Sequence, residues 1–432
     1  MKALTFDYNL ARCALAKLAG MVHAPWYLAA WGPVRYREVP EPKLLGDDWV
    51  IVQTHHTGIC GSDLRQVFLD GSMDNPLTAL ISFPHVMGHE VVGTICETGR
   101  AATEWRPGDR VIAYPWLTCD ARSLPRCPAC EAGHYQCCQF TTDTHLGVGM
   151  HLGVSAQVSG GFAPWLAVHK SMCFRVPEGV RLDHAAMADP FAVALRAVHR
   201  AEPAPGQTVL VIGCGTLGTW AMKILRTYYP LVRVLAVDTH MHLGEHVRRL
   251  GVDAYYYQRG RELIEAIAQD TRALLRRPRW AQPWLLGSGA GVGVDTIIDT
   301  VGTSATIEAG LRIIKPMGRI VHVGLARRAN VEWTPLYFKE ITLVGCNGCG
   351  MEHIEGKAQH AFAYYLDELQ RGRLDADGII THQFALADYR KAFVTARDKG
   401  RFRSLKVMFS YQSPTQSGNG QGTDRPTSRG AL

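Results

Sequence analysis

The chain has 432 residues, of which 47% are hydrophobic and 20% are charged, and its formal net charge is +7. This length predicts two or three domains, and the composition predicts a soluble globular protein with large cores. The positive charge suits an anionic ligand but is too diffuse to indicate nucleic acid. Five of the twelve cysteines fall between Cys119 and Cys138, a clustering typical of a metal site rather than of a disulfide framework. Because thiolate ligands need a reducing compartment, we expect a cytoplasmic protein.

Two strands are predicted near the N-terminus, over Lys2–Phe6 and Val34–Val39. The apolar segment Ala11–Trp31 lies between them and raises the question of a membrane span. Polar, charged and helix-breaking residues interrupt it, namely Arg12, Lys17, His23 and Pro25. No run near 18 apolar residues remains, so we expect an inserted helix or loop that serves as a subunit contact, and no membrane partner.

Two short motifs follow the strand predicted at Trp49–Thr54. The first, Gly58-Ile-Cys-Gly-Ser-Asp, contains Cys60, and the second, Gly88-His-Glu-Val-Val-Gly93, contains His89 and Glu90. A thiolate with a neutral imidazole and a nearby acid suits zinc. Taken singly, each residue also fits an ordinary buried position.

The stretch from Gln207 to Asp238 has the strongest pattern in the chain. The apolar run Val209–Ile212 predicts a strand buried on both faces, Thr219–Tyr228 a helix, and Val232–Val237 a second strand. Between the first strand and the helix stands a G-x-G-x-x-G turn, made of Gly213, Gly215, Thr216, Leu217 and Gly218. These glycines allow a tight turn, close approach to a pyrophosphate and close helix packing, and the helix N-terminus favours the phosphates.

Asp238 ends the second of these strands, where a carboxylate can hold both ribose hydroxyls and would repel a 2′-phosphate. The pattern therefore predicts a dinucleotide site that prefers NAD to NADP. A tight turn without a ligand is the alternative interpretation.

The same alternation of strands and helices continues through Gly293–Gly302, Gly318–Leu325 and Ile341–Leu343, which is typical of a parallel sheet. Arg272–Ser288 interrupts it with arginines, prolines and tryptophans, and we interpret this stretch as a solvated insertion rather than a nucleic-acid patch. A closing strand is predicted at Leu405–Phe409. Residues 413–432 are almost free of apolar side chains, and we expect a disordered tail.

Together, the Cys60 and His89–Glu90 motifs and the glycine-rich turn resemble the zinc-dependent medium-chain dehydrogenase/reductase family, which includes the alcohol, sorbitol and threonine dehydrogenases. The resemblance extends from Trp49 to about Phe409. It implies an α/β fold with a GroES-like, β-rich catalytic domain over residues 1–189, containing a lobe at 119–138. A Rossmann domain with a doubly wound parallel sheet would follow at 190–325, and residues 326–412 would return to the catalytic domain.

The resemblance also implies a catalytic zinc at Cys60, His89 and an acid. Asp189, in AAMADPFAVALRAVH, matches the family's acid before a proline, and Glu90 is the other carboxylate; a helix N-cap is the alternative role for Asp189. By the same likeness Ser62 is the first proton relay and Asp63 orients His89 from behind. Arg65 stands where many members have a histidine, so the outer relay must differ or Arg65 contacts a cofactor phosphate.

A structural zinc is the second implied metal. The family's C-x2-C-x2-C-x7-C pattern matches Cys127, Cys130 and Cys138 in its last three positions, and its first position falls on Leu124. We expect Cys119 to loop back as the fourth ligand across the insertion Asp120–Arg126, with Cys137 able to replace Cys138. A lobe of free thiols or one disulfide is the alternative.

The function implied is a zinc-dependent oxidoreductase that transfers a hydride between an alcohol or polyol and NAD, in a dimer or tetramer. Zinc would lower the pKa of the alcohol so that it ionises near neutral pH. Two alternatives remain open: a dehydrogenase of aldehydes or thiol adducts such as hydroxymethyl-glutathione, and a nucleotide-binding protein without catalysis.

Overall fold

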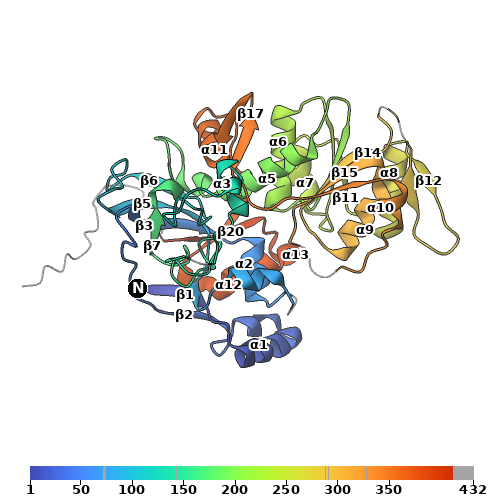
Figure 1. Cartoon of the computed structure of the whole chain (residues 1–432). Coiled ribbons are helices and arrows are strands. Elements are labelled where there is room, and N and C mark those ends of the chain that lie inside the picture. The colour runs from blue at the N-terminus through green and yellow to red at the C-terminus, as the bar shows by residue number, and fades with distance from the viewer. Residues whose placement is uncertain (72–73, 143, 288, 290, 326–328, 412–432) are drawn as a thin grey trace, which may run out of the picture.

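The computed structural model of the chain describes residues 1–71, 74–142, 144–287, 289, 291–325 and 329–411 (Figure 1). These residues form two bodies around separate β-sheets, with helix α5 (Ala188–Ala201) between them. In Figure 1 the body that contains the first strand, β1 (Lys2–Phe6), and the last strand, β20 (Lys406–Ser410), lies on the left, and the body with the parallel sheet lies on the right. The tail predicted at 413–432 lies outside the described residues.

One body contains a six-stranded parallel sheet in the order β11-β10-β9-β14-β15-β16. Its two central strands are buried along their whole length, because helices cover both sides of the sheet. The strands are β9 (Thr208–Ile212), β10 (Arg233–Val237), β11 (Ala254–Tyr256), β14 (Val294–Asp299), β15 (Ile314–His322) and β16 (Thr342–Gly345).

Two details of this body differ from the boundaries expected from sequence. Helix α6 (Thr216–Tyr228) begins at Thr216 rather than Thr219, because Gly215 is its N-cap and the third glycine of the turn lies inside the first helical turn. The sheet also continues beyond residue 325, because α10 (Thr334–Phe338) forms a crossover and β16 then pairs in parallel with β15.

The other body contains a mostly antiparallel sheet in the order β19-β20-β3-β5-β6-β8, with β7 also paired to β3. The strands are β3 (Trp49–Gly58), β5 (Glu90–Thr98), β6 (Arg110–Ala113), β7 (Trp165–His169), β8 (Cys173–Arg175), β19 (Ile380–Phe384) and β20 (Lys406–Ser410). Met408 of β20 pairs with Gly58 at the end of β3, so the last strand of the fold lies beside the residues that lead into Cys60.

Three smaller sheets accompany the two large ones among the described residues. β1 (Lys2–Phe6) pairs with β2 (Val34–Glu38) and β4 (His85–Val86). β17 (Met351–Ile354) pairs with β18 (Lys357–His360). The arginine-rich insertion contains an antiparallel pair, β12 (Leu274–Arg276) and β13 (Trp284–Leu286), and Trp280 at its tip is 86% exposed.

The remaining helices surround these sheets. They are α1 (Leu10–Val22), α2 (Gly61–Val67), α3 (Pro128–Glu131), α4 (Leu182–Ala185), α7 (Leu243–Arg249), α8 (Gly260–Asp270), α9 (Ser304–Ile313), α11 (Ala361–Gln370), α12 (Tyr389–Arg397) and α13 (Lys399–Phe402), with short 3-10 turns including η1 (Ala24–Leu28). The insertion at Ala11–Trp31 is therefore mainly α1 and η1. Within the described residues, no helix has the length and apolar character needed to span a membrane.

Helix α5 joins the two bodies through its core. Phe191 stacks against Tyr365 of α11 at 4.6 Å between ring centroids and meets the edge of Trp220 of α6 at 5.3 Å. A single hydrophobic cluster consequently includes residues of both sheets. Because Asp189 lies in the first turn of α5, which contacts β5, this packing also places that residue beside the antiparallel sheet.

Candidate active site and metal centres

The pairing of β3 with β5 brings the first metal-like cluster together. Gly58 pairs with Glu90 across these strands, so Cys60, just after β3, faces His89, just before β5. Ligating atoms of Cys60, His89 and Glu90 all lie within 4.8 Å of one another. The two motifs recognised in the sequence therefore meet at one buried point.

Asp63 holds two members of this cluster. Its Oδ2 accepts a 2.8 Å hydrogen bond from the Cys60 N–H, and its Oδ1 lies 3.7 Å from His89 Nδ1. Burial opposes a charge on His89, but Asp63 and Cys60 outweigh burial and raise the pKa of His89 well above 6.5. Asp63 thus lies beside the His89 imidazole, and its role in orienting the ring stays a prediction.

Glu90 also has a partner that sequence reasoning missed. Its carboxylate forms an ion pair with Lys406, and the two side chains are only 2% and 3% exposed. Lys406 Nζ donates in addition to the Ile59 carbonyl at 3.1 Å. Gly58 leaves space for the pair, since a Cβ there would lie 1.9 Å from Glu90 Oε2.

Asp189 is buried close to this cluster but does not join the set of mutually close ligating atoms among the described residues. Burial raises the pKa of Asp189 to about 6; His89 opposes this rise and Glu90 adds to it. The charges of His89 and Glu90 therefore act on the Asp189 carboxylate as well. Direct ligation by Asp189 stays a prediction.

The donor set fits zinc. A thiol, an imidazole and acids converge in a buried place where zinc prefers sulfur and nitrogen with a carboxylate. Lys406 is a buried positive charge beside Glu90 and Asp63. A divalent cation bound here would offset much of the negative charge that remains on these acids and on the Cys60 thiolate. Ser62 is exposed on the first turn of α2, next to Cys60, and its role as a proton relay stays a prediction.

The second cluster consists of Cys119, Cys127, Cys130 and Cys138, whose Sγ atoms all lie within 4.8 Å of one another. The Sγ atoms of Cys119 and Cys138 are 3.6 Å apart, which is far longer than the S–S bond of a disulfide. The distance is close to the sulfur–sulfur separation of about 3.8 Å expected for four cysteines arranged as a tetrahedron around zinc. Burial raises the pKa of Cys127, but backbone N–H donors from Gln139 and Cys130 bring it to about 6, which favours a thiolate. Cys137 is exposed and lies outside this set.

Arg122, inside the insertion that displaces Cys119, is a residue whose role the sequence did not indicate. Its side chain is 1% exposed and donates to the carbonyl oxygens of Leu117 at 3.1 Å and Gly147 at 3.1 Å, among other acceptors in 141–149. Arg122 therefore ties the inserted loop to the segment that follows the lobe.

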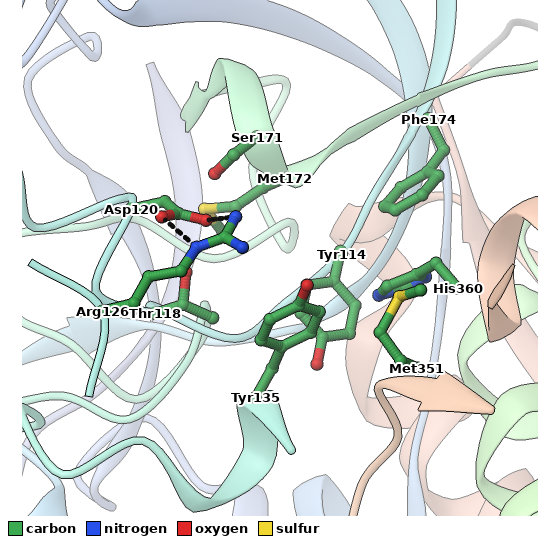
Figure 2. Close-up of a pocket in the computed structure, with 10 residues that line it drawn as sticks. All are labelled: Tyr114, Thr118, Asp120, Arg126, Tyr135, Ser171, Met172, Phe174, Met351 and His360. Atoms are coloured by element: carbon green, nitrogen blue, oxygen red, sulfur yellow. Dashed lines mark hydrogen bonds and ion pairs between the residues drawn. The ribbon is translucent and has the colours of Figure 1, made fainter. Parts of the chain in front are cut away.

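Asp120 and Arg126, at the two ends of the same insertion, form two hydrogen bonds of 3.0 and 2.8 Å. Figure 2 shows this pair on one side of a cavity of about 190 Å³, facing the rings of Tyr114, Tyr135 and His360. None of the predicted catalytic residues lines this cavity. The pair closes the loop around the cysteine cluster.

The glycine-rich turn has the geometry expected of a dinucleotide site. Gly213 has φ +91°, a conformation that favours glycine, and a Cβ on Gly218 would lie 1.8 Å from the Gly213 carbonyl oxygen. Asp238 Oδ2 accepts a 2.8 Å hydrogen bond from the Cys214 N–H. Its Oδ1 accepts from the His240 N–H at 3.0 Å and lies 2.8 Å from His240 Nδ1.

The returning C-terminal segment connects this turn to the metal-like cluster. Thr216 Oγ1 donates to the Leu405 carbonyl at 3.2 Å, directly before Lys406. Lys399 Nζ would lie 3.3 Å from a Cβ on Gly215, and burial lowers the pKa of this lysine while Asp238 opposes the decrease. The cofactor loop and the Cys60 cluster thus share one short stretch of chain.

Known proteins resemble both bodies. Residues 46–178 match the family described as alcohol dehydrogenase GroES-like domain, and residues 216–370 match zinc-binding dehydrogenase. A probable D-xylulose reductase A of Neosartorya fischeri is 27% identical over 294 residues, which cover 68% of this chain and 73% of that protein.

Two solved structures show the same fold. One is described as a short chain alcohol dehydrogenase from Escherichia coli CFT073 in complex with NADH, with a TM-score of 0.69, 21% identity and coverage of 95% of this chain and 99% of the other. The other is galactitol-1-phosphate dehydrogenase from Escherichia coli, with a TM-score of 0.67, 21% identity and coverage of 95% and 100%. With both domains matched and the two metal-like clusters in place, the chain belongs to the zinc-dependent medium-chain dehydrogenase/reductase family.

Proposed function

We propose that the protein transfers a hydride between a secondary hydroxyl of a polyol and NAD. The observation that carries the proposal is the meeting of Cys60, His89 and Glu90 within 4.8 Å, beside the segment that contacts the cofactor loop. The names of its relatives, a D-xylulose reductase and a galactitol-1-phosphate dehydrogenase, support a polyol as the substrate.

Cys60 and His89, with Glu90 and Asp189 as the available acids, would hold the catalytic zinc. When bound, zinc acts as a Lewis acid that lowers the pKa of a coordinated alcohol. The Ser62 hydroxyl, exposed beside Cys60, receives the proton that leaves the substrate, and Asp63 keeps the His89 ring oriented. Cys119, Cys127, Cys130 and Cys138 would hold a structural zinc.

The cofactor would lie along the glycine-rich turn, with its pyrophosphate at the N-terminus of α6. Asp238 supports NAD rather than NADP, because a carboxylate hydrogen-bonds ribose hydroxyls and repels a 2′-phosphate. The related Escherichia coli structure that contains NADH is consistent with this preference.

We also infer a reducing, cytoplasmic location and a homo-oligomer. Eight residues, five of them cysteines, are proposed ligands, and their thiolates would be oxidised in a secretory compartment. The subunit number, dimer or tetramer, rests on the family resemblance.

The test is zinc per chain in protein purified without added metal, followed by NADH formation from a panel of polyols. Two zinc ions and turnover of at least one polyol would support the proposal. Turnover confined to hydroxymethyl-glutathione would favour the thiol-adduct alternative. Tight NADH binding without turnover of any substrate, or the absence of zinc, would contradict the proposed catalysis.

A further inference from the structure

A second cavity, of about 460 Å³, lies between the N-terminal insertion and helix α2. Six of the side chains that line it are Lys17, Tyr27, Arg65, Phe68, Asp70 and Arg397. They come from α1, η1, helix α2 and the residues that follow it, and the end of α12. The predicted catalytic ligands and the glycine-rich turn do not line this cavity.

The insertion builds one wall of the cavity through close packing. A Cβ on Gly20 of α1 would lie 2.3 Å from the Tyr27 ring, so the glycine allows this ring to lie directly on the helix. Tyr27 in turn meets the edge of the Phe68 ring at 5.5 Å between centroids. Tyr27 and Phe68 are 6% and 5% exposed, and this packed pair forms a rigid floor.

Arg397 lies over this floor with its donors available. Its guanidinium carbon is 4.2 Å from the centroid of Phe68 and 5.2 Å from that of Tyr27. Among the described residues, no hydrogen bond or ion pair involves the guanidinium group of Arg397. Stacking on two rings fixes the plane of the guanidinium without using its N–H groups, which is an arrangement suited to bidentate recognition of an anion.

Lys17 of α1 adds a second cation to the lining. Its Nζ donates one 2.9 Å hydrogen bond to the Leu69 carbonyl, and within the part of the chain that the structure describes it has no ion pair. Arg65 is the third cation, and Asp70 is the acidic residue among the lining side chains. The lining therefore has an excess of positive charge, which an anionic ligand would balance.

We infer that this cavity binds the phosphate group of a phosphorylated polyol, whose other end presents its hydroxyl at Cys60 and His89. This inference rests on the proposed function. The lining residues Leu64 and Arg65 of α2 follow Cys60 by four and five positions, a rise of roughly 6–8 Å along a helix that rises about 1.5 Å per residue. That range suits the length of a short sugar alcohol. A phosphate dianion matches several cations from separate elements better than a monoanionic carboxylate does.

The first measurement is calorimetric titration of inorganic phosphate into the zinc-loaded protein saturated with NADH, so that the cofactor's own phosphate sites are filled. Arg397→Gln and Lys17→Gln should each weaken phosphate binding at least tenfold, because each removes one charged donor. Arg397→Lys should restore part of the affinity. Lys391→Gln on α12 and Arg12→Gln on α1 are the controls, since they remove exposed cations from the same helices outside the cavity.

The second measurement compares glucitol with glucitol 6-phosphate as substrates of the wild type and of Arg397→Gln. The expected result is a KM at least tenfold lower for the phosphate ester in the wild type, and loss of this preference in the variant with unchanged kcat for glucitol. Phosphate binding at the cavity without any preference for the ester would assign the site to free phosphate and overturn its role in substrate binding.

Other outcomes separate the inference from the proposed function. Turnover of unphosphorylated polyols with no phosphate binding, or with equal binding in all variants, would overturn the cavity's role and leave the proposed function standing. Cavity-dependent phosphate binding without turnover of any polyol or ester would overturn the proposed function alone. A tenfold loss of NADH affinity in Lys17→Gln would show that the cations serve the cofactor, which also overturns the inference.

Discussion

Lys406 and Glu90 form an ion pair in which neither side chain is more than 3% exposed. The lysine belongs to the last strand of the fold, and the glutamate opens β5 beside His89. Breaking a buried pair by removing one partner leaves the other charge uncompensated, which typically costs about 3–5 kcal/mol.

Lys406→Met should therefore lower the melting temperature by roughly 5–10 °C, because it removes the buried ammonium group that pairs with the Glu90 carboxylate. Scanning calorimetry of the zinc-loaded protein measures this shift. Lys391→Met is the control, since Lys391 is 76% exposed in its pair with Asp388 and its loss should change stability by no more than about 0.5 kcal/mol. Equal shifts in the two variants would show that burial of the Lys406 pair contributes nothing.

Cys60→Ser should abolish turnover while NADH still binds. The substitution removes the thiolate from the first cluster, whereas the glycine-rich turn lies on the other body. Zinc per chain should fall from about two to about one, and NADH fluorescence should report an unchanged dissociation constant. Turnover retained at the wild-type rate would remove the catalytic-zinc assignment.

Cys119→Ser should lose the other zinc and destabilise the lobe, since Cys119 is a buried member of the four-cysteine cluster. Zinc analysis and a thermal melt test this. Cys137→Ser is a matched control in the same lobe, because Cys137 is exposed and outside the cluster. Zinc loss in the control rather than in Cys119→Ser would assign the fourth ligand to Cys137.

His360→Asn should make the protein less sensitive to acid. Burial lowers the pKa of His360 to about 3, although Glu352 opposes the decrease. In the unfolded chain the histidine pKa is about 6.5, so between these values only the unfolded state binds the proton. Stability is therefore lost as pH falls below about 6.5, with a slope of about 1.4 kcal/mol per pH unit for this group.

Asparagine does not titrate in this range, and its side chain still accepts the hydrogen bond that His360 accepts from the Phe362 N–H at the start of α11. Chemical unfolding at pH 6.0, 5.5 and 5.0 should show a shallower loss of unfolding free energy in His360→Asn. Parallel curves for the two proteins would contradict the low pKa.

Much of the fold follows from local pattern. The strands at Lys2–Phe6 and β9, and the glycine-rich turn between β9 and α6, depend on alternation, apolar runs and glycine, all of which lie within a few residues. The strand at Ile341–Leu343 was predicted as well, but the domain boundary at residue 325 left it outside the Rossmann domain, and β16 is an edge strand of the sheet with mostly exposed side chains. Its pairing with β15 is decided by backbone hydrogen bonds that composition does not encode.

The candidate site shows a similar division. Cys60, His89 and Glu90 belong to compact motifs, and Cys119 could be proposed as a distant member of the cysteine cluster. Lys406 and Arg122 could not be foreseen, because their roles depend on partners brought near by the tertiary fold rather than on neighbours in sequence. Burial of a charged residue is visible only once the packing around it is known.

The hydrogen bond from Thr216 to the Leu405 carbonyl places one end of a two-residue stretch on the cofactor loop and the other, Lys406, on Glu90. This stretch is therefore a route through which binding at one site would affect binding at the other. Any factor by which bound NADH changes the affinity for zinc through this stretch must equal the factor by which zinc changes the affinity for NADH. To that same extent, a cell short of zinc would hold a protein with an altered affinity for NADH.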